Sequence, residues 1–407
     1  MKISELIKRE PFDRIFIETF TLFLDEVFGK SHIVEWKRKS LTNSTLMQQW
    51  YCNPLINSIF VKKVNPNVFR SINGEYLDNP LKPWRSLLQK LYLHLSQNHI
   101  TSQFFAKYKI EISPPLEDPS NKLIIGGNTK IRMIDISKNI VYVILKNGFD
   151  KKFIDKEIYI REKFINLPVT KIIKQSQNAL WFCEEYIHGI SPNRMHADKG
   201  KETLQKVVDH IHDMLNETKK KISLAKYTFR LENEIDVAVK KLVFMENNVK
   251  ERIVKIKRAL IELLDDYMEM KVTIAYCHGD FHQGNILANE KKFWILDWEN
   301  SGEKQISYDL LILLLQSRNV DGYIRRLNKI IQNDLTKDQN KLIDNWPGID
   351  FRNVNLKKIN LVLFLLEELN FYVSETTNSL FIKDSGQINS RLKIFEEALN
   401  STYFQKF

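Results

Sequence analysis

The sequence predicts an α+β protein with a small β-rich lobe, then a large helical lobe, and a mostly helical domain in front of both. Three observations support this prediction. Short β-branched runs separated by turns lie within residues 122–145, and apolar residues at helical spacing fill residues 201–270. A proline-rich stretch at 113–119 separates both from an earlier helical region. We therefore expect domains at 1–118, 119–190 and 191–407.

The composition is that of a globular protein, and only 13 of the 407 residues are glycine. Glycine is favoured where the backbone takes a positive φ or approaches a ligand closely, so each glycine in such a chain invites a structural question. No apolar run reaches the ~18 residues that a membrane-spanning helix needs. The three cysteines are far apart and form no metal or disulfide pattern, which favours a reducing cytoplasm.

The formal net charge is +11, and most of the excess falls in residues 1–200. Such a bias is typical of proteins with an anionic partner, which here means nucleotide phosphates, nucleic acid or anionic lipid. We favour a solvated lysine-rich surface, because the lysines alternate with acidic and apolar residues and form no basic arm. Nucleic acid is the least favoured partner.

The N-terminal domain is expected to contain helices at 15–28 and 84–95, the second with an apolar stripe through Leu87, Leu88, Leu91 and Leu95. Its tryptophans and tyrosines are expected in the core rather than in a ligand pocket. The role of this domain is left open.

The next elements have the order of a small sheet followed by helices. The expected strands are 122–125, 131–136, 140–145, 171–174 and 180–183, with a helix at 150–166. Further helices are expected at 356–374 and 388–403, and a strand at 272–276 leads into the most polar segment.

That segment, 278–287, reads HGDFHQGNIL, and the short apolar strand 293–296 follows it and ends in two carboxylates. A loop between two strands can bring Asp280, Asn285 and Asp297 together. Oxygen-bearing side chains at one place suit Mg²⁺ with a substrate phosphate. A rival interpretation takes His278, Asp280 and His282 as metallohydrolase ligands, but it leaves the other polar residues unexplained.

Phosphoryl transfer needs a carboxylate for the attacking hydroxyl, ligands for the metal and a cation for the phosphates. The turn at 126–129, made of Gly126, Gly127, Asn128 and Thr129, can offer backbone N–H groups to phosphate oxygens. Lys146 ends the third strand, and Glu157 on the following helix can orient its ammonium group. Lys130, which we expect to face solvent, and Glu162 are the competing residues for these two roles.

Here the sequence resembles the aminoglycoside phosphotransferase and choline kinase group of protein-kinase-like enzymes. The resemblance rests on HGDFHQGNIL at 278–287, LDWE at 296–299 and SYDL at 307–310, with support from CEEYIHG at 183–189. It covers residues 120–320 and implies a two-lobed fold, with the turn at 126–129 and Glu157 near the nucleotide.

The resemblance also implies roles. Asp280 would be the catalytic base, Asn285 and Asp297 the metal ligands, and Lys146, paired with Glu157, the ligand of the α- and β-phosphates. The remaining implied residues are Glu185 and Ile187 in the stretch that would face the adenine, and Asp309, which would brace the catalytic loop. His278 is expected to support the loop, while His282 and Glu299 could contact the acceptor or be structural.

Departures from protein kinases indicate the acceptor. Gly279 stands where those enzymes carry arginine, and Tyr308 follows Glu299 too closely for a peptide-binding activation segment. The sequence therefore predicts an ATP- and Mg²⁺-dependent kinase acting on a hydroxyl of a small molecule, with GTP as the other possible donor. A sugar, glycan precursor, amino alcohol or aminoglycoside would be the acceptor. The alternative is an inactive nucleotide-binding module that binds a protein partner.

Overall fold

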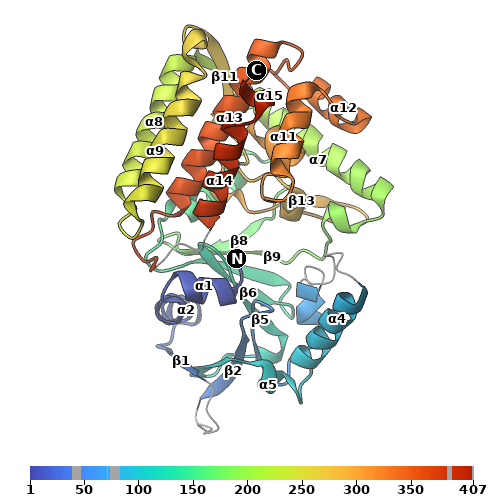
Figure 1. Ribbon diagram of the computed structural model, residues 1–407. Coiled ribbons are helices and arrows are strands. Elements are labelled where there is room, and N and C mark those ends of the chain that lie inside the picture. The colour runs from blue at the N-terminus through green and yellow to red at the C-terminus, as the bar shows by residue number, and fades with distance from the viewer. Residues whose placement is uncertain (39–46, 71, 74–82, 383–386, 406–407) are drawn as a thin grey trace. The chain divides into compact units, whose positions relative to one another are not determined.

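The computed structural model describes residues 1–38, 47–70, 72–73, 83–382 and 387–405 (Figure 1). These residues divide into two compact units. Unit 1 consists of residues 1–161 and 170–190, and unit 2 consists of residues 162–169 and 191–407. Unit 1 contains the sheet and unit 2 is mainly helical, so the predicted fold class, a β-rich lobe followed by a helical lobe with added N-terminal helices, is confirmed.

Unit 1 is built on a nine-stranded antiparallel sheet with the order β1-β4-β2-β3-β5-β6-β7-β9-β8. The strands are β1 (Ile33–Arg38), β2 (Gln48–Asn53), β3 (Ser58–Val61), β4 (Tyr108–Ser113), β5 (Lys122–Gly126), β6 (Lys130–Asp135), β7 (Ile140–Leu145), β8 (Ile172–Gln175) and β9 (Trp181–Glu185). Its helices are α1 (Ile3–Arg9), α2 (Phe12–Phe28), α4 (Pro83–Gln97), α5 (Ser102–Phe105) and α6 (Lys152–Lys163).

One apolar core joins the N-terminal helices to this sheet. Phe16, Phe20 and Phe23 lie on the same side of α2 and are almost fully buried, because residues three and four apart share a helix face. Phe23 makes an edge contact with the ring of Trp181 on β9, at 5.8 Å between centroids. The start of the chain is therefore packed on strands that come more than a hundred residues later.

The predicted helices at 15–28 and 84–95 are present as α2 and α4, but four strands of residues 1–118 were not expected. These strands belong to the same sheet as the later ones, since Ile59 of β3 lies opposite Ile124 of β5. Charged residues interrupt the alternating pattern of β1 and β4, where Lys37 pairs with Glu111 across the ladder. The boundary predicted at 118 therefore falls between strands of one sheet, and a separate role for 1–118 stays a prediction.

Unit 2 is a set of helices around two small sheets. Its helices are α7 (Ala197–Thr218), α8 (Leu224–Lys240), α9 (Asn247–Glu262), α10 (Tyr308–Leu315), α11 (Tyr323–Gln332), α12 (Lys337–Asn345), α13 (Val354–Glu375), α14 (Gln387–Leu399) and α15 (Thr402–Gln405). The strands form β10 (Lys220–Ser223), β11 (Lys271–Cys277) and β14 (Gly302–Gln305) in one sheet, and β12 (Ile286–Ala288) with β13 (Phe293–Ile295) in the other.

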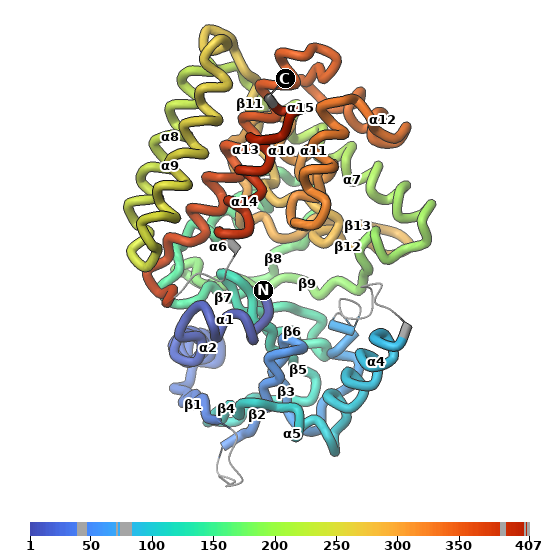
Figure 2. Tube along the Cα trace, in the orientation of Figure 1, coloured from blue at the N-terminus to red at the C-terminus, as the bar shows by residue number. Residues whose placement is uncertain are grey.

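Helix α13 is the central helix of unit 2. It is apolar on all sides, with Leu361, Val362, Leu363, Phe364, Leu365 and Leu366 all fully buried. It packs against α8, α9 and α14 (Figure 2). Within the described residues, no helix is long and apolar enough to cross a membrane.

Candidate active site

The polar loop 278–285 connects β11 to the β12–β13 hairpin in unit 2. Leu296 N donates a 2.8 Å hydrogen bond to Asn285 O, which continues the ladder of the hairpin by one residue. Asn285 at the start of β12 is therefore next to the residue that precedes Asp297. Asp297 itself has a left-handed backbone, with φ at +65°. The hairpin thus brings together the two residues predicted to hold a metal.

Asp309, near the start of α10, braces the loop as predicted by the resemblance. Its carboxylate accepts hydrogen bonds from the backbone N–H of His278 at 2.7 Å and of Gly279 at 2.9 Å. Burial raises the pKa of Asp309, and His278 together with these two amides opposes the rise. Gly279 has φ at +82°, and a Cβ there would lie 2.1 Å from Asn300 O. A side chain at position 279 would therefore clash with the backbone, so this turn requires glycine.

His278 links this loop to the hairpin. Its Nδ1 accepts from the backbone N–H of Asp280 at 3.2 Å, and its Nε2 lies 2.9 Å from Leu296 O. The imidazole ring packs 4.4 Å from the ring of Trp298. With both nitrogens engaged in backbone contacts and the side chain buried, His278 has the geometry of a supporting residue.

Asp280 is held by three side chains. Arg318 Nε lies 2.5 Å from its Oδ1, His282 Nε2 lies 3.6 Å from its Oδ2, and Asn285 Nδ2 donates to its backbone oxygen at 2.9 Å and to Oδ2 at 3.3 Å. Burial acts to raise the pKa of Asp280, but the charge of Arg318 and the contacts with His282 outweigh it and lower the pKa to about 2. The carboxylate is therefore ionised and fixed in position.

Arg318, which follows α10, was not predicted. Its Nη1 also contacts the buried carboxylate of Glu368 at 3.0 Å, and Tyr372 Oη lies 2.9 Å from the same nitrogen. Arg318 lies 38 residues after Asp280, and no local motif joins the two. The one available signal is a charged residue three positions after the end of the apolar run 310–315.

The donor set fits Mg²⁺. Because Asn285 Nδ2 is used in hydrogen bonds to Asp280, the amide oxygen is the atom that can act as a ligand. With the Asp297 carboxylate it gives two hard oxygen donors, and Mg²⁺ commonly takes one or two protein ligands plus substrate phosphates and water. The described residues contain no cluster of three His, Cys, Asp or Glu that could hold a metal, as the metallohydrolase interpretation would need.

Two further residues of the predicted site, His282 and Glu299, are neighbours along the chain of Asp280, Asn285 and Asp297. His282 is half-exposed and its Nδ1 accepts from Gly284 N at 3.0 Å, so it caps the turn that carries Asn285. Glu299 is buried in the short turn after Asp297. These positions agree with structural roles, and contact with an acceptor stays a prediction for both.

In unit 1, the predicted phosphate turn connects β5 and β6. A Cβ on Gly126 would lie 2.7 Å from the side chain of Ile3, and one on Gly127 would lie 2.6 Å from Lys130 O. Gly126 is therefore needed for packing against α1, and Gly127 for the tightness of the turn. Thr129 O accepts the backbone N–H of Lys146 at 3.0 Å, which ties the turn to the end of β7.

The end of α1 contacts the same turn. Lys146 Nζ lies 2.6 Å from Glu10 Oε1 and donates to Asn128 O at 2.8 Å. Arg9 pairs with Glu10 at 2.6 Å and also hydrogen-bonds the side chain of Asn128. The predicted phosphate-binding lysine is thus fully buried and paired with a carboxylate from the N-terminal segment.

Glu157 on α6, predicted to pair with Lys146, makes ion pairs with two other cations. It contacts Lys130 Nζ at 2.7 Å and Arg161 Nη1 at 2.6 Å, and Arg161 also contacts Glu184 at 2.8 Å. Lys130 was expected to face solvent, yet it is 2% exposed, so that expectation is wrong. Its burial is possible because a carboxylate neutralises its charge.

The stretch predicted to face the adenine lies at the end of β9. Glu185 is the last residue of β9, and Ile187 comes two positions later; both are half-buried. Glu185 lies opposite Ile140, the first residue of β7. The stretch therefore leaves the sheet beside the start of the strand whose other end precedes Lys146. Its role toward a nucleotide stays a prediction.

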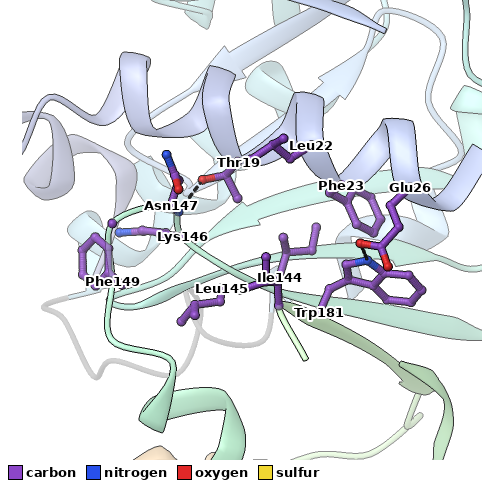
Figure 3. Close-up of a pocket in the computed structure, with 12 residues that line it drawn as sticks. Thr19, Leu22, Phe23, Glu26, Ile144, Leu145, Lys146, Asn147, Phe149 and Trp181 are labelled. Carbon is purple, nitrogen blue, oxygen red and sulfur yellow. Dashed lines mark hydrogen bonds between the residues drawn. The ribbon is translucent and has the colours of Figure 1, made fainter. Parts of the chain in front are cut away.

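Unit 1 also contains a cavity of about 130 Å³ between α2 and the sheet. Thr19, Phe23 and Glu26 line it from α2, and Lys146 and Trp181 line it from the sheet (Figure 3). Thr19 Oγ1 accepts from Asn147 N at 2.8 Å, and Trp181 Nε1 donates to Glu26 at 2.9 Å. The predicted phosphate turn 126–129 does not line this cavity, whereas Lys146, the lysine predicted to bind the phosphates, does.

Comparison with protein families gives a match over residues 163–337. This segment matches the phosphotransferase enzyme family. The resemblance predicted from the sequence is thereby confirmed. The matched segment contains Asp280, Asn285, Asp297 and Asp309, together with the unpredicted Arg318. The turn at 126–129 and Lys146 lie outside it.

Several solved structures are similar to the chain at low identity. A choline/ethanolamine kinase family protein from Mesorhizobium loti is 15% identical, with a TM-score of 0.43, over 79% of this chain and 97% of that one. The choline kinase LicA from Streptococcus pneumoniae is 13% identical, with a TM-score of 0.42, over 70% and 91%. An ethanolamine kinase from Plasmodium vivax is 14% identical, with a TM-score of 0.47, over 83% and 94%. No curated protein matches the chain.

Proposed function

We propose that this protein is a small-molecule kinase that transfers the γ-phosphate of ATP, with Mg²⁺, to a hydroxyl group of its acceptor. The observation that carries the proposal is the arrangement around Asp280. An ionised carboxylate is fixed in a braced loop, and the amide of Asn285, in contact with it, stands beside the hairpin end that leads to Asp297. The match of residues 163–337 to a phosphotransferase family supports the same reaction class.

Asp280 would act mainly by orienting the acceptor hydroxyl. A carboxylate whose pKa is lowered to about 2 is a weak base, so it takes the proton only as the hydroxyl oxygen forms its bond to phosphorus. Positioning and charge neutralisation account for most of the catalysis of phosphoryl transfer, where little covalent chemistry falls to the protein. The brace from Asp309 and the contact from Arg318 serve this positioning.

Asn285 and Asp297 would hold Mg²⁺. When bound, the metal would neutralise charge on the phosphates of the nucleotide. Lys146 would supply a further positive charge to the phosphates, since its ammonium lies beside the turn at 126–129. For that role its ammonium must exchange at least part of its contact with Glu10 for phosphate oxygens.

The acceptor is proposed as a class, a hydroxylated small molecule. The experiment is a screen of sugars, glycan precursors, amino alcohols and aminoglycosides for release of ADP from ATP, and of GDP from GTP, with Mg²⁺ present. We expect Asp280→Asn to abolish acceptor-dependent release while nucleotide binding, measured by calorimetry, is kept. Wild-type transfer by Asp280→Asn would refute the assignment of Asp280.

The alternative is a nucleotide-binding module without turnover. The contacts of Asp280 with Arg318 and of Lys146 with Glu10 favour it, because both functional groups are already neutralised by neighbouring charges. The same screen separates the two proposals. Thermal stabilisation by ATP and Mg²⁺ that is lost in Asp297→Ala, with no ADP release for any acceptor, would favour the module.

A further inference from the structure

Helix α4 presents an apolar face to solvent. Trp84, Leu87, Leu88 and Leu91 follow the spacing i, i+3, i+4 and i+7, which places them on one side of the helix. Their exposed fractions are 57%, 68%, 54% and 52%. We call these four residues the α4 face. The apolar stripe found in the sequence is therefore helical as predicted, but the expectation that Trp84 lies in the core is wrong.

The opposite side of α4 anchors the helix to unit 1. Leu93 is 4% exposed and Ser96 is fully buried. Tyr92 makes an edge contact with the ring of Phe105 on α5, at 5.3 Å between centroids, and its hydroxyl donates to Asn53 at 3.2 Å. This buried side holds α4 on unit 1, and the α4 face is a second side, whose residues are mostly exposed.

Helix α5 and the connection before it carry further exposed apolar side chains. Helix α5 packs against α4, as Figure 2 shows. Phe104 on α5 is 71% exposed, and Ile100 in the connection between the two helices is 60% exposed. Elsewhere the exposed apolar side chains of the described residues are more scattered; on α8, for example, Phe229 and Val237 are eight positions apart. Scattered apolar residues need no explanation, but a continuous group indicates a binding surface.

The charge of this region is one-sided. Residues 83–110 contain four Lys or Arg and no Asp or Glu. Arg85, Lys90 and Lys107 are exposed, and the guanidinium of Arg85 lies 5.2 Å from the ring centroid of Trp84. A helix with a Trp- and Leu-rich face and only basic charged residues has the pattern of helices that lie in the interface of a bilayer.

We propose that the α4 face docks on the surface of an anionic lipid bilayer. The apolar side chains would enter the boundary between headgroups and acyl chains, while the exposed Arg and Lys side chains contact the lipid phosphates. A second copy of this chain fits less well, because a symmetric contact would bring the same basic residues together, and residues 83–110 offer no acidic partner. The proposal does not depend on the proposed kinase activity.

The experiment is flotation of the purified full chain with two kinds of vesicle, one of phosphatidylcholine and one of phosphatidylcholine with phosphatidylglycerol in equal parts. We expect binding to the anionic vesicles alone, weakened by added salt. Leu87→Gln, Leu88→Gln and Leu91→Gln combined should weaken it at least about tenfold, because the apolar area that enters the bilayer is lost. Arg85→Gln and Lys90→Gln should each weaken it by about fivefold.

A matched control replaces exposed apolar residues of unit 2. Phe229→Gln, Val237→Gln and Val243→Gln combined remove a similar exposed apolar area and should leave vesicle binding unchanged. Circular dichroism checks that both triple variants are folded. The proposal is overturned if the chain binds neither vesicle, or if the α4 variant binds as the wild type does. It is also overturned if light scattering shows self-association that only the α4 variant loses.

Discussion

The guanidinium of Arg318 lies 2.5 Å from the carboxylate of Asp280, and the same side chain contacts Glu368 through a second nitrogen at 3.0 Å. One arginine thus connects the loop that carries the proposed catalytic carboxylate to the central helix α13. Both carboxylates have little exposure, so this charge is screened less by water than a surface ion pair would be. The position of Asp280 therefore depends on a residue outside the loop.

Replacement of Arg318 by Lys should lower kcat by about a hundredfold, because small errors in the position of a reacting group cost about that much. The KM for ATP should change little, since the contacts that the structure gives for Arg318 are with the catalytic loop and with α13. A lysine keeps the charge but cannot contact Asp280 and Glu368 with separate nitrogens of one planar group. Steady-state kinetics with the acceptor found in the screen measures both constants.

The control for this variant is Arg318→Met, which removes the charge as well. It should be less active than Arg318→Lys, because Asp280 and Glu368 then have no neutralising partner at this position. Wild-type kcat in both variants, with unchanged thermal stability, would mean that Arg318 has no positioning role.

If Lys146 binds the phosphates as proposed, its contact with Glu10 predicts that this carboxylate orients its ammonium group. Lys146→Met should raise the KM for ATP by about ten- to a hundredfold, the effect of losing one or two charge-assisted contacts. Glu10→Gln should change the KM for ATP in the same direction but less, because the amide can still accept a hydrogen bond from the ammonium. ATP titration followed by calorimetry measures the corresponding changes in the Kd for ATP without an acceptor.

A lower KM for ATP in Glu10→Gln would contradict this prediction. It would show instead that Glu10 competes with phosphate for Lys146, so that the N-terminal segment restrains nucleotide binding.

Glu157 should matter for stability, since it neutralises two buried cations. Lys130 and Arg161 both contact it, and all three side chains have little exposure. Glu157→Gln should lower the free energy of unfolding by about 3 kcal/mol, the typical effect of leaving a buried charge uncompensated. Urea unfolding measures the loss. The matched control is Glu162→Gln on the same helix, where an exposed side chain should change stability by less than about 0.5 kcal/mol.

The outcome for Glu162 decides how specific the effect is. If both variants lose the same stability, the helix and not the ion pair is responsible, and the network around Glu157 contributes nothing particular.

The sequence predicted those parts of the site that are close together along the chain. Asp280, Asn285 and Asp297 lie within one loop and one hairpin, so a short motif describes them and local geometry brings them together. Arg318 and Glu10 were missed because their contacts join residues 38 and 136 positions apart. No periodicity or motif encodes contacts at such separations, since they depend on how helices and strands pack.

The same distinction holds for the fold. The strands 122–125, 131–136 and 140–145 were predicted closely, because their β-branched runs are buried on both faces. The strands of residues 1–118 have mixed polar patterns, and the burial of their apolar residues depends on a core that they share with α2 and with the later strands β5, β6, β7 and β9. The helix α4 was predicted from its apolar period, but a period cannot tell a buried face from an exposed one.

Glu367 on α13 should make stability depend on pH. Burial raises its pKa to about 7, although Lys304, Tyr227 and the backbone N–H of Gln305 favour the ionised form. Because the folded pKa lies above the unfolded value near 4.5, the fold favours the protonated carboxyl. This stabilisation is complete below the unfolded value and is lost as pH rises through about 7. The wild type should thus lose up to about 3 kcal/mol relative to a variant with no charge at this position.

Glu367→Gln provides that variant, because an amide resembles the protonated carboxyl and stays neutral at every pH. Its Oε1 can still accept from Tyr227 and from the backbone of Gln305, as the glutamate does. Urea unfolding at about pH 5 and about pH 8, on either side of the folded pKa, should show a loss in the wild type that is much smaller in Glu367→Gln. The control is Glu397→Gln on α14, where the side chain is exposed and the wild-type pH dependence should persist. An equal loss of stability in wild type and Glu367→Gln would mean that Glu367 stays in one protonation state across this range, and that other groups cause the pH dependence.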